Sequence, residues 1–373
     1  MKSDPENRRI RQLHAVEPRP VPGEAPDLIL VHPQTRLACR LNSSAAFLWS
    51  VLAEEGRPSA VAERLAAEFA IPRDEAARAV SDFVYRMGAL GFVDASDGSL
   101  SERLRERYLN LLKAALTNLI YPEHELRIEL LEQEGAKPDL PRQMRDIRYR
   151  GAELFEDLVA HKADGRVWRG KATRFSHTMI GLRRLQNLEW CAGQIFDGGI
   201  EGDFLEAGVC QGGAAIFLRA LQVAHGQDWR RTWVADSFEG LPKPTSEFDE
   251  GYELHEEAQP WLAASLTAVQ DNFRSYDLLS EQVRFLPGWF ADSLAEAPVE
   301  GLAILRIDAD LYSSTRDVLE ALYDKVVPGG FVIIDDYHVF PNCRRAVDEF
   351  RSERGVGDPL IRIDWTAVFW RKT

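Results

Sequence analysis

Acidic residues collect at the ends of two apolar segments of this 373-residue chain. Asp308 and Asp310 close one segment, and Asp335 and Asp336 close the next. A single aspartate in such a place usually caps a helix or faces water, but four carboxylates brought together repel one another unless a proton or a cation intervenes. Hard oxygen ligands of this kind suit Mg²⁺. The pattern therefore favours a divalent-metal site over four unrelated caps.

A glycine-rich turn, GVCQGG at 208–213, follows another short apolar segment. Glycines let a ligand approach the backbone, and the helix expected after the turn presents free N–H groups. The turn is not a GxGxxG motif and lacks the lysine of a phosphate-binding loop. The next apolar segment ends in Asp236, where an acidic residue commonly binds a ribose diol. This pairing predicts a nucleoside-bearing ligand and leaves NAD and S-adenosylmethionine both open.

Apolar strands alternating with helices are expected to position these residues from about residue 200 onwards. Such alternation predicts an α/β fold with a mostly parallel sheet covered on both faces, whose ligands bind at the carboxyl ends of the strands. The expected strands are 204–209, 232–236, 283–286, 302–308 and 330–336, followed by a terminal hairpin of 360–363 and 367–370.

Composition and charge bound the class of protein. Hydrophobic residues make up 45% and charged residues 28%, which excludes a wholly disordered or collagen-like chain. No apolar run is long enough for a membrane span, and the polar start carries no signal core. Four scattered cysteines without a CxxC pair argue against a disulfide framework or structural zinc and fit a reducing cytoplasm. A net charge of −14 disfavours nucleic-acid binding.

The first hundred residues predict a separate α+β domain. Two strand-like runs, 28–32 and 36–41, flank a turn at 33–35, and three short helices are expected to begin after Asn42, at Pro58 and at Pro72. This succession resembles a winged helix. We expect a flexible N-terminus at 1–14, this domain at 15–95, a linker at 96–104, a helical lid or oligomerisation segment at 105–175 and the catalytic domain at 176–373.

The succession LNSSAAFLW, two further helices and GFV within 28–93 resembles the PqqD-like family. That resemblance implies a peptide-binding module, which in clusters for ribosomally synthesised, modified peptides docks the leader of a precursor peptide. Winged helices more often bind DNA, but residues 1–100 hold 12 Lys/Arg against 14 Asp/Glu and so lack a basic excess. Strand addition to a hairpin edge needs no net charge. A purely stabilising or dimerising role also remains open.

Residues 104–373 resemble the TylF-like macrocin O-methyltransferases, which use S-adenosylmethionine to methylate sugars of natural products. The matching stretches include SHTMIGLRRLQNLEWC (176–191), GDFLEAGVCQGGA (202–214), TWVADSFEGLPKP (232–244), LRIDADLYSST (305–315) and GGFVIIDDYH (329–338). The resemblance implies a Rossmann-like methyltransferase sheet with an antiparallel last strand. It assigns Asp308, Asp335 and Asp336 as Mg²⁺ ligands and Asp310 as general base. It places Glu206, Gly208, Gly212, Asp236 and Ser237 in the cofactor cleft, Trp289 near the adenine, and Tyr121, His177 and Met179 in segments that approach the cofactor or lid.

The sequence departs from the family in three places. Cys210-Gln211 replaces the usual Trp-Arg of the glycine turn, so an arginine that might pair with the methionine carboxylate is absent. Residues 122–175 are longer and more charged than the family's lid region, which argues against a macrolide sugar as acceptor. The PqqD-like segment is the third addition.

These observations lead us to expect an Mg²⁺-dependent O-methyltransferase, forming at least a homodimer. The fusion suggests a ribosomal peptide, recruited through its leader, as substrate. The alternative acceptor is a sugar hydroxyl or other small molecule, with the N-terminal domain serving assembly. A regulatory protein that only binds S-adenosylmethionine is disfavoured, because the acidic constellation is intact.

Overall fold

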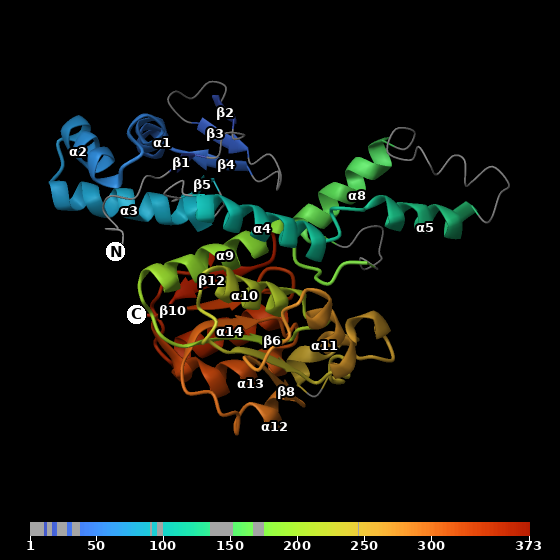
Figure 1. Ribbon diagram of the computed structural model, residues 1–373. Helices are drawn as coiled ribbons and strands as arrows, with labels where there is room; N and C mark the ends of the chain where they lie inside the picture. The colour runs from blue at the N-terminus through green and yellow to red at the C-terminus, as the bar shows by residue number, and fades with distance from the viewer. Residues whose placement is uncertain are drawn as a thin grey trace. The chain divides into compact units, whose positions relative to one another are not determined.

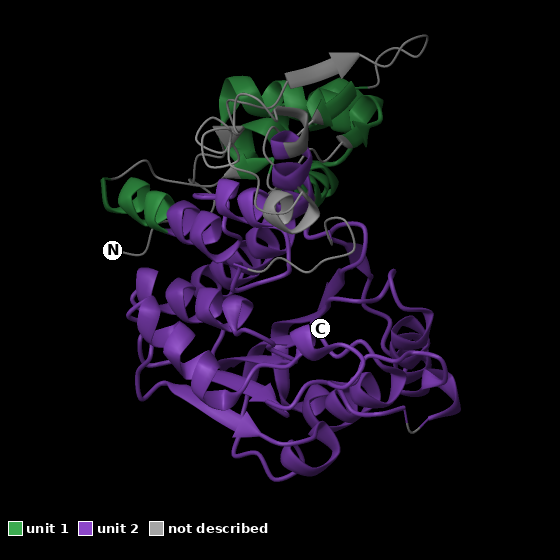
Figure 2. Ribbon diagram, turned by 90° about the vertical axis from the view of Figure 1, so that its right-hand side faces the viewer, with its two compact units in different colours: residues 1–108 green, residues 109–373 purple. Residues whose placement is uncertain are grey.

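The computed structural model describes most of the chain, namely residues 11–12, 17–20, 28–31, 38–89, 92–94, 100–134, 152–166, 175–244 and 246–373. Two compact units are present, residues 1–108 and residues 109–373 (Figure 2). Each unit has its own hydrophobic core and is described by itself.

The first unit combines small antiparallel sheets with three helices. The central sheet has the order β2-β3-β4, and β1 pairs with β5. Trp49, Leu52, Val80 and Phe92 are buried in its core, and the Asn42 side chain caps α1 by accepting a hydrogen bond from the Ala45 N–H at 3.0 Å. The elements are β1 (Arg11–Gln12), β2 (Glu17–Pro20), β3 (Leu28–Val31), β4 (Ala38–Leu41), α1 (Ser43–Glu55), α2 (Pro58–Phe69), α3 (Arg73–Ala89) and β5 (Val93–Asp94).

Three features of this region differ from the expectation. Strand β2 lies in the proline-rich stretch expected to be coil, because it is an edge strand in which prolines need not donate to a ladder. Residues 11–12, expected in a flexible N-terminus, pair with β5. Helix α4 begins at Leu100, so the second half of the expected linker is helical. The rest of the expected tail, the hairpin turn 33–35 and residues 96–99 lie outside the described residues.

Helices lead into the second unit (Figure 1). They are α4 (Leu100–Leu116), which continues across the boundary between the units, α5 (Glu123–Glu134), α8 (Ala152–Asp164) and α9 (Leu182–Asp197). Leu109, Leu112 and Leu116 of α4 are buried at helical spacing, which explains why a helix forms there. No described helix combines the length and the apolar composition that crossing a membrane requires.

A seven-stranded sheet organises the second unit in the order β11-β12-β10-β9-β6-β7-β8. Strands β10, β9, β6, β7 and β8 are parallel, and β12 runs antiparallel to β10. The expected α/β class with a mostly parallel sheet and an antiparallel last strand is confirmed. The strands are β6 (Asp203–Ala207), β7 (Thr232–Asp236), β8 (Val283–Pro287), β9 (Leu302–Ile307), β10 (Val326–Ile334), β11 (Ile361–Arg362) and β12 (Val368–Arg371).

Both faces of this sheet are covered. Alternate residues of β6, β9 and β10 pack with α13 (Tyr312–Leu322) and α14 (Pro341–Glu353) into one hydrophobic cluster. The intervening residues face α9 and α10 (Gly213–Ala224), where Trp190 contacts Phe331 at 5.7 Å between ring centroids. The loops after β7 and β8 carry α11 (Leu266–Ser275), α12 (Phe290–Ser293) and short 3₁₀ turns, including η2 (Glu247–Asp249). Because β6, β7, β9 and β10 are parallel, their carboxyl ends lie along one edge of the sheet.

Candidate active site

Three aspartates at this edge approach one another closely. Asp308 follows β9, and Asp335 and Asp336 follow the neighbouring strand β10, whose pairing continues through a hydrogen bond from the Asp335 N–H to the Ile307 carbonyl at 2.9 Å. One carboxylate oxygen from each of the three lies within 4.8 Å of the others. Adjacent parallel strands end at the same level, and this brings residues 27 and 28 positions apart in the chain to one point.

Two buried arginines hold this acidic cluster, and sequence reasoning did not assign a role to either. Arg306 lies opposite Glu206 in the register of β9 and β6, and its guanidinium donates to Glu206, Asp308 and Asp335. Arg184 of α9 donates to the other oxygen of Asp335. The sequence did hold one indication of the role of Arg306, because it is a charged residue inside the otherwise apolar run LAILRI.

Glu206 is placed inside the sheet, not at its surface. Its side chain is 2% exposed and pairs with Arg306 through one oxygen, while the other oxygen is buried and has no hydrogen bond within the described part of the chain. Burial is the main cause that raises the pKa of this carboxyl to about 8. Its described contact orients Arg306, and its expected place in the cofactor cleft stays a prediction.

The donor set fits a divalent cation. Asp336 is buried, and its Oδ2 has no hydrogen-bond partner among the described residues. Burial and the neighbouring carboxylates raise the pKa of Asp308 and, more strongly, that of Asp336. The guanidinium groups of Arg184 and Arg306 carry fewer charges than the carboxylates around them. A divalent cation, which prefers oxygen ligands, would offset the remaining negative charge. Asp308, Asp335 and Asp336 are the residues that would hold Mg²⁺.

Asp310 lies two residues beyond the metal-ligand candidate Asp308 on the same loop. Its backbone φ is +55°, a left-handed conformation that aspartate tolerates better than most residues. Burial and the charges of Asp308 and Asp335 raise the pKa of Asp310 to about 8. A carboxyl tuned to this range suits proton transfer near neutral pH.

Asp249 of η2 holds the segment that follows Asp310. The Asp249 side chain is fully buried and accepts hydrogen bonds from the Tyr312 N–H at 2.6 Å and from the Ser313 N–H at 3.1 Å, which caps α13. The Asn342 side chain donates to the same carboxylate at 2.8 Å. Asp249 therefore ties the loop after β7 to α13 and α14, a role that the sequence alone did not indicate.

The glycine turn packs against backbone on two sides. Gly208 has a φ of +86°, and a Cβ there would lie 1.8 Å from the Asp308 carbonyl oxygen. Gly212, with a φ of +85°, caps α10, and a Cβ on Gly213 would lie 2.2 Å from the His177 carbonyl oxygen. Only glycine permits these approaches. Burial raises the pKa of the Cys210 thiol in this turn to about 12, so the thiol stays protonated.

Asp236 fixes the glycine turn to β7. One carboxylate oxygen accepts hydrogen bonds from the Val209 N–H at 2.7 Å and the Cys210 N–H at 3.3 Å, and the other accepts from the Phe238 N–H at 2.8 Å. The Ser237 hydroxyl donates to the Gly240 carbonyl at 2.6 Å. Both side chains shape the turns beside the expected cofactor position.

Four more residues were expected near the cofactor or lid, namely Trp289, His177, Met179 and Tyr121. Trp289 follows Gly288, whose N–H donates to the Asp236 carbonyl at 3.0 Å, so the backbone at Trp289 is close to the end of β7, and its side chain is exposed. His177 lies against the start of α10 and shares a 2.7 Å hydrogen bond with the Tyr276 hydroxyl, and Met179 follows it with a partly exposed side chain. Tyr121 has a largely exposed ring that contacts His124, and its expected place near the cofactor stays a prediction.

Two family models match the chain. The macrocin-O-methyltransferase (TylF) model matches residues 105–372, and the coenzyme PQQ synthesis protein D (PqqD) model matches residues 27–93. The order of the two segments is the one expected from the sequence.

Curated relatives cover the same region. A tetracenomycin 4′-O-methyltransferase from Streptomyces olivaceus is 44% identical over 277 residues, which span 74% of this chain and 95% of the relative. A mycinamicin III 3″-O-methyltransferase from Micromonospora griseorubida is 48% identical over 272 residues, 72% of this chain and 97% of the relative. The solved structure of the O-methyltransferase NovP is 40% identical, with a TM-score of 0.58, and the match covers 72% of this chain and 99% of that one.

These matches agree with the sheet topology and the glycine turn. The chain belongs to the macrocin-O-methyltransferase (TylF) family and is an S-adenosylmethionine-dependent O-methyltransferase with a PqqD segment at its N-terminus.

Proposed function

We propose that this enzyme transfers a methyl group from S-adenosylmethionine to a hydroxyl group in an Mg²⁺-dependent reaction. The observation that carries the proposal is the convergence of Asp308, Asp335 and Asp336 beside the glycine turn, with a buried oxygen on Asp336 that no described residue hydrogen-bonds. When bound, Mg²⁺ would lower the pKa of the acceptor hydroxyl and orient it.

The glycine turn and the start of α10 are the proposed site of the methyl donor. The free N–H groups and positive end of α10 suit the carboxylate of the methionine portion. Trp289 and the end of β7 are the proposed neighbours of the nucleoside. Asp236 contributes by holding the Val209 and Cys210 N–H groups in place.

Asp310 is the proposed general base. The acceptor oxygen forms a bond to the methyl carbon as the bond between that carbon and sulfur breaks, and the proton of the hydroxyl passes to the Asp310 carboxylate. The donor is already activated as a sulfonium, so the chain's main contributions are alignment of the two reactants and removal of this proton.

For the acceptor, we propose a hydroxyl on a substrate that carries a ribosomal leader peptide. The match of residues 27–93 to the PqqD family supports this, because a peptide can add as a strand to the edge of the β2-β3-β4 sheet. The four free cysteines fit a reducing compartment such as the cytoplasm.

A second candidate acceptor is a sugar hydroxyl of a small natural product, without a peptide. The names of the relatives favour it, because they describe O-methylation of tetracenomycin and mycinamicin compounds. The PqqD segment would then serve assembly.

One experiment separates the two candidates. The full chain is incubated with S-adenosylmethionine, Mg²⁺ or a chelator, and candidate precursor peptides with and without their leaders, and products are weighed by mass spectrometry. We expect a gain of one methyl mass that requires Mg²⁺, with a higher KM but unchanged kcat when the leader is removed. Methylation of a sugar-bearing compound, and of no peptide, would support the second candidate. Methylation that persists with chelator would refute the metal role.

A further inference from the structure

Arg184 links the acidic cluster to the end of a helix outside the sheet. Its guanidinium donates to Asp335 through Nη1, lies 3.0 Å from the Asp364 carboxylate through Nε, and donates to the Gly165 carbonyl at 3.2 Å through Nη2. The side chain is 7% exposed. Since Arg306 binds the other oxygen of Asp335, the two arginines together fix the plane of that carboxylate.

Helix α8 ends at Asp164, and residues 164–166, here called the end of α8, lie against Arg184. Gly165 has a φ of +65°, and a Cβ there would lie 2.3 Å from the Gly181 nitrogen and 2.4 Å from Arg184 Nη2. A side chain at this position would therefore force the end of α8 away from Arg184.

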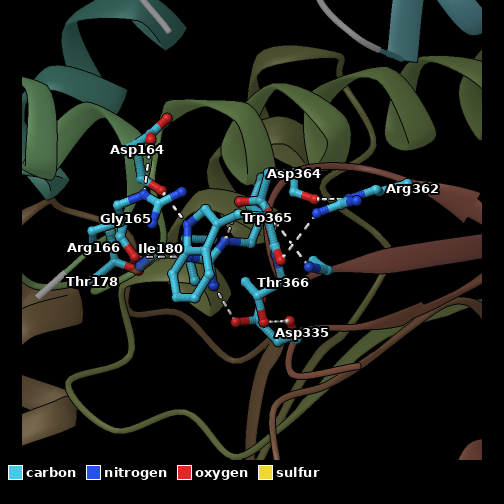
Figure 3. Close-up of polar contacts among 12 residues, drawn as sticks. Asp164, Gly165, Arg166, Thr178, Ile180, Asp335, Arg362, Asp364, Trp365 and Thr366 are labelled. Carbon is cyan, nitrogen blue, oxygen red and sulfur yellow. Dashed lines mark hydrogen bonds and ion pairs between the residues drawn. The ribbon is translucent and has the colours of Figure 1, made fainter. Parts of the chain in front are cut away.

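The turn between β11 and β12 also connects the end of α8 to Asp335 (Figure 3). The Trp365 indole donates to the Asp164 carbonyl at 2.9 Å, and the Arg166 guanidinium lies 4.7 Å from the centre of the Trp365 ring. At the other end of this turn, the Thr366 hydroxyl donates to the Asp335 carbonyl at 2.7 Å. Asp364 braces the turn by accepting from the Thr366 N–H at 3.0 Å.

We propose that Arg184 is a positioning residue that couples the docking of the end of α8 to the metal-binding orientation of Asp335. This inference rests on the proposed function, in which Asp335 is a metal ligand. The Arg184 guanidinium binds both the Gly165 carbonyl and the Asp335 carboxylate. When the Gly165 contact is lost, Arg184 can move, and the Asp335 carboxylate then loses one of the two arginines that orient it. Such coupling is reciprocal, so metal binding should in turn stabilise the docked end of α8.

The rest of α8 has an independent anchor, which makes the proposal testable. Lys162 is buried and donates to Glu125 at 2.5 Å and to Ser176 at 2.8 Å. These contacts do not involve Arg184, so α8 is expected to stay folded when Arg184 is replaced.

The test compares Arg184→Lys with Arg219→Lys in the full chain. Both arginines are buried, but the described contacts of Arg219 include the Asp228 and Arg230 carbonyls, to which it donates, and no residue of the acidic cluster. Mg²⁺ affinity is measured by calorimetry, and amide hydrogen exchange of residues 152–166 is measured with and without Mg²⁺.

We expect Arg184→Lys to weaken Mg²⁺ binding about ten- to a hundredfold, as replacement of a residue that orients a metal ligand typically does. Arg219→Lys should bind Mg²⁺ as the unmodified chain does. Mg²⁺ should slow exchange at the end of α8 in the unmodified chain and in Arg219→Lys, but not in Arg184→Lys. Trp365→Phe, which removes the indole N–H donor and leaves a smaller ring beneath Arg166, should speed exchange at the end of α8 and weaken Mg²⁺ binding by a smaller factor.

Each contrary outcome has a distinct meaning. Equal Mg²⁺ affinity in the two lysine variants overturns the role of Arg184 and leaves the metal site intact. Exchange at the end of α8 that does not respond to Mg²⁺ in the unmodified chain overturns the coupling. If the unmodified chain binds no Mg²⁺, the proposed metal role and this inference both fall.

Discussion

Replacement of Gly208 by alanine tests whether the close approach of β6 and β9 positions the acidic cluster. In the native chain the Gly208 N–H donates to the Ala235 carbonyl at 2.9 Å, and the Asp308 N–H donates to the Ala207 carbonyl at 2.8 Å. An alanine Cβ at position 208 would lie 1.8 Å from the Asp308 carbonyl oxygen, whereas real Cβ contacts almost never fall below 3.0 Å. The atom it meets is backbone, so no side chain can turn away to relieve the contact.

The size of the effect follows from these distances. The two strand ends must separate by about 1.2 Å, the difference between the two values. Asp308 moves with its strand, and a misplacement of about 1 Å can cost about a hundredfold in rate. The positive φ of Gly208 adds a strain of about 1–2 kcal/mol for any residue with a Cβ.

Gly226→Ala is a matched control for this prediction. Gly226 also has a positive φ, of +65°, but a Cβ there would meet no atom of the described residues within 4 Å. Both variants therefore carry backbone strain, and only Gly208→Ala displaces Asp308. We expect Gly208→Ala to lower kcat about a hundredfold and to weaken Mg²⁺ binding in calorimetry, while Gly226→Ala loses only thermal stability. If the two variants show the same kcat and the same Mg²⁺ affinity, the reasoning is wrong.

Two further predictions concern proton transfer and pH. Asp310→Asn should keep the left-handed backbone and the Mg²⁺ affinity but lower kcat by about 10²- to 10⁴-fold in a methyl-transfer assay, and a smaller loss would argue against Asp310 as the base. Without metal, the raised pKa values of Glu206 and Asp310, each about 8, mean that the folded state holds protons that the unfolded state releases. The melting temperature of the metal-free enzyme should therefore fall as pH rises from about 4.5 to about 8. Mg²⁺ binds the deprotonated carboxylates, so it should raise the melting temperature more at the upper end of this range, and a uniform effect would contradict the assignment.

Much of the second unit was predictable because its strands are short apolar runs bounded by glycine and polar residues. The expected strand 232–236 matches β7 (Thr232–Asp236), and the other expected strands overlap those observed. The antiparallel last strand came from the family resemblance. In the first unit, β2 was missed because its prolines are typical of coil, and only its position at the edge of a sheet makes them compatible with a strand.

The candidate site was predicted only in part. The aspartates at the ends of β9 and β10 were identified because their spacing relative to apolar runs is a local property of the sequence. Arg184, Arg306 and Asp249 were missed because their roles depend on partners that are distant in the chain: Arg184 meets Asp335, which is 151 residues away. The pairing of Glu206 with Arg306 was missed for the same reason, because it follows from the register of β6 and β9.

The sequence by itself determined the class of fold, the glycine turn and the acidic residues, because hydrophobic periodicity and the chemistry of side chains act over a few neighbouring positions. Only the tertiary structure decided which carboxylates converge, which of them are held by arginine, and that the end of α8 touches the same guanidinium as Asp335. Those facts arise from strand order and helix packing, which bring distant segments together and place charges in surroundings where burial changes their proton affinity.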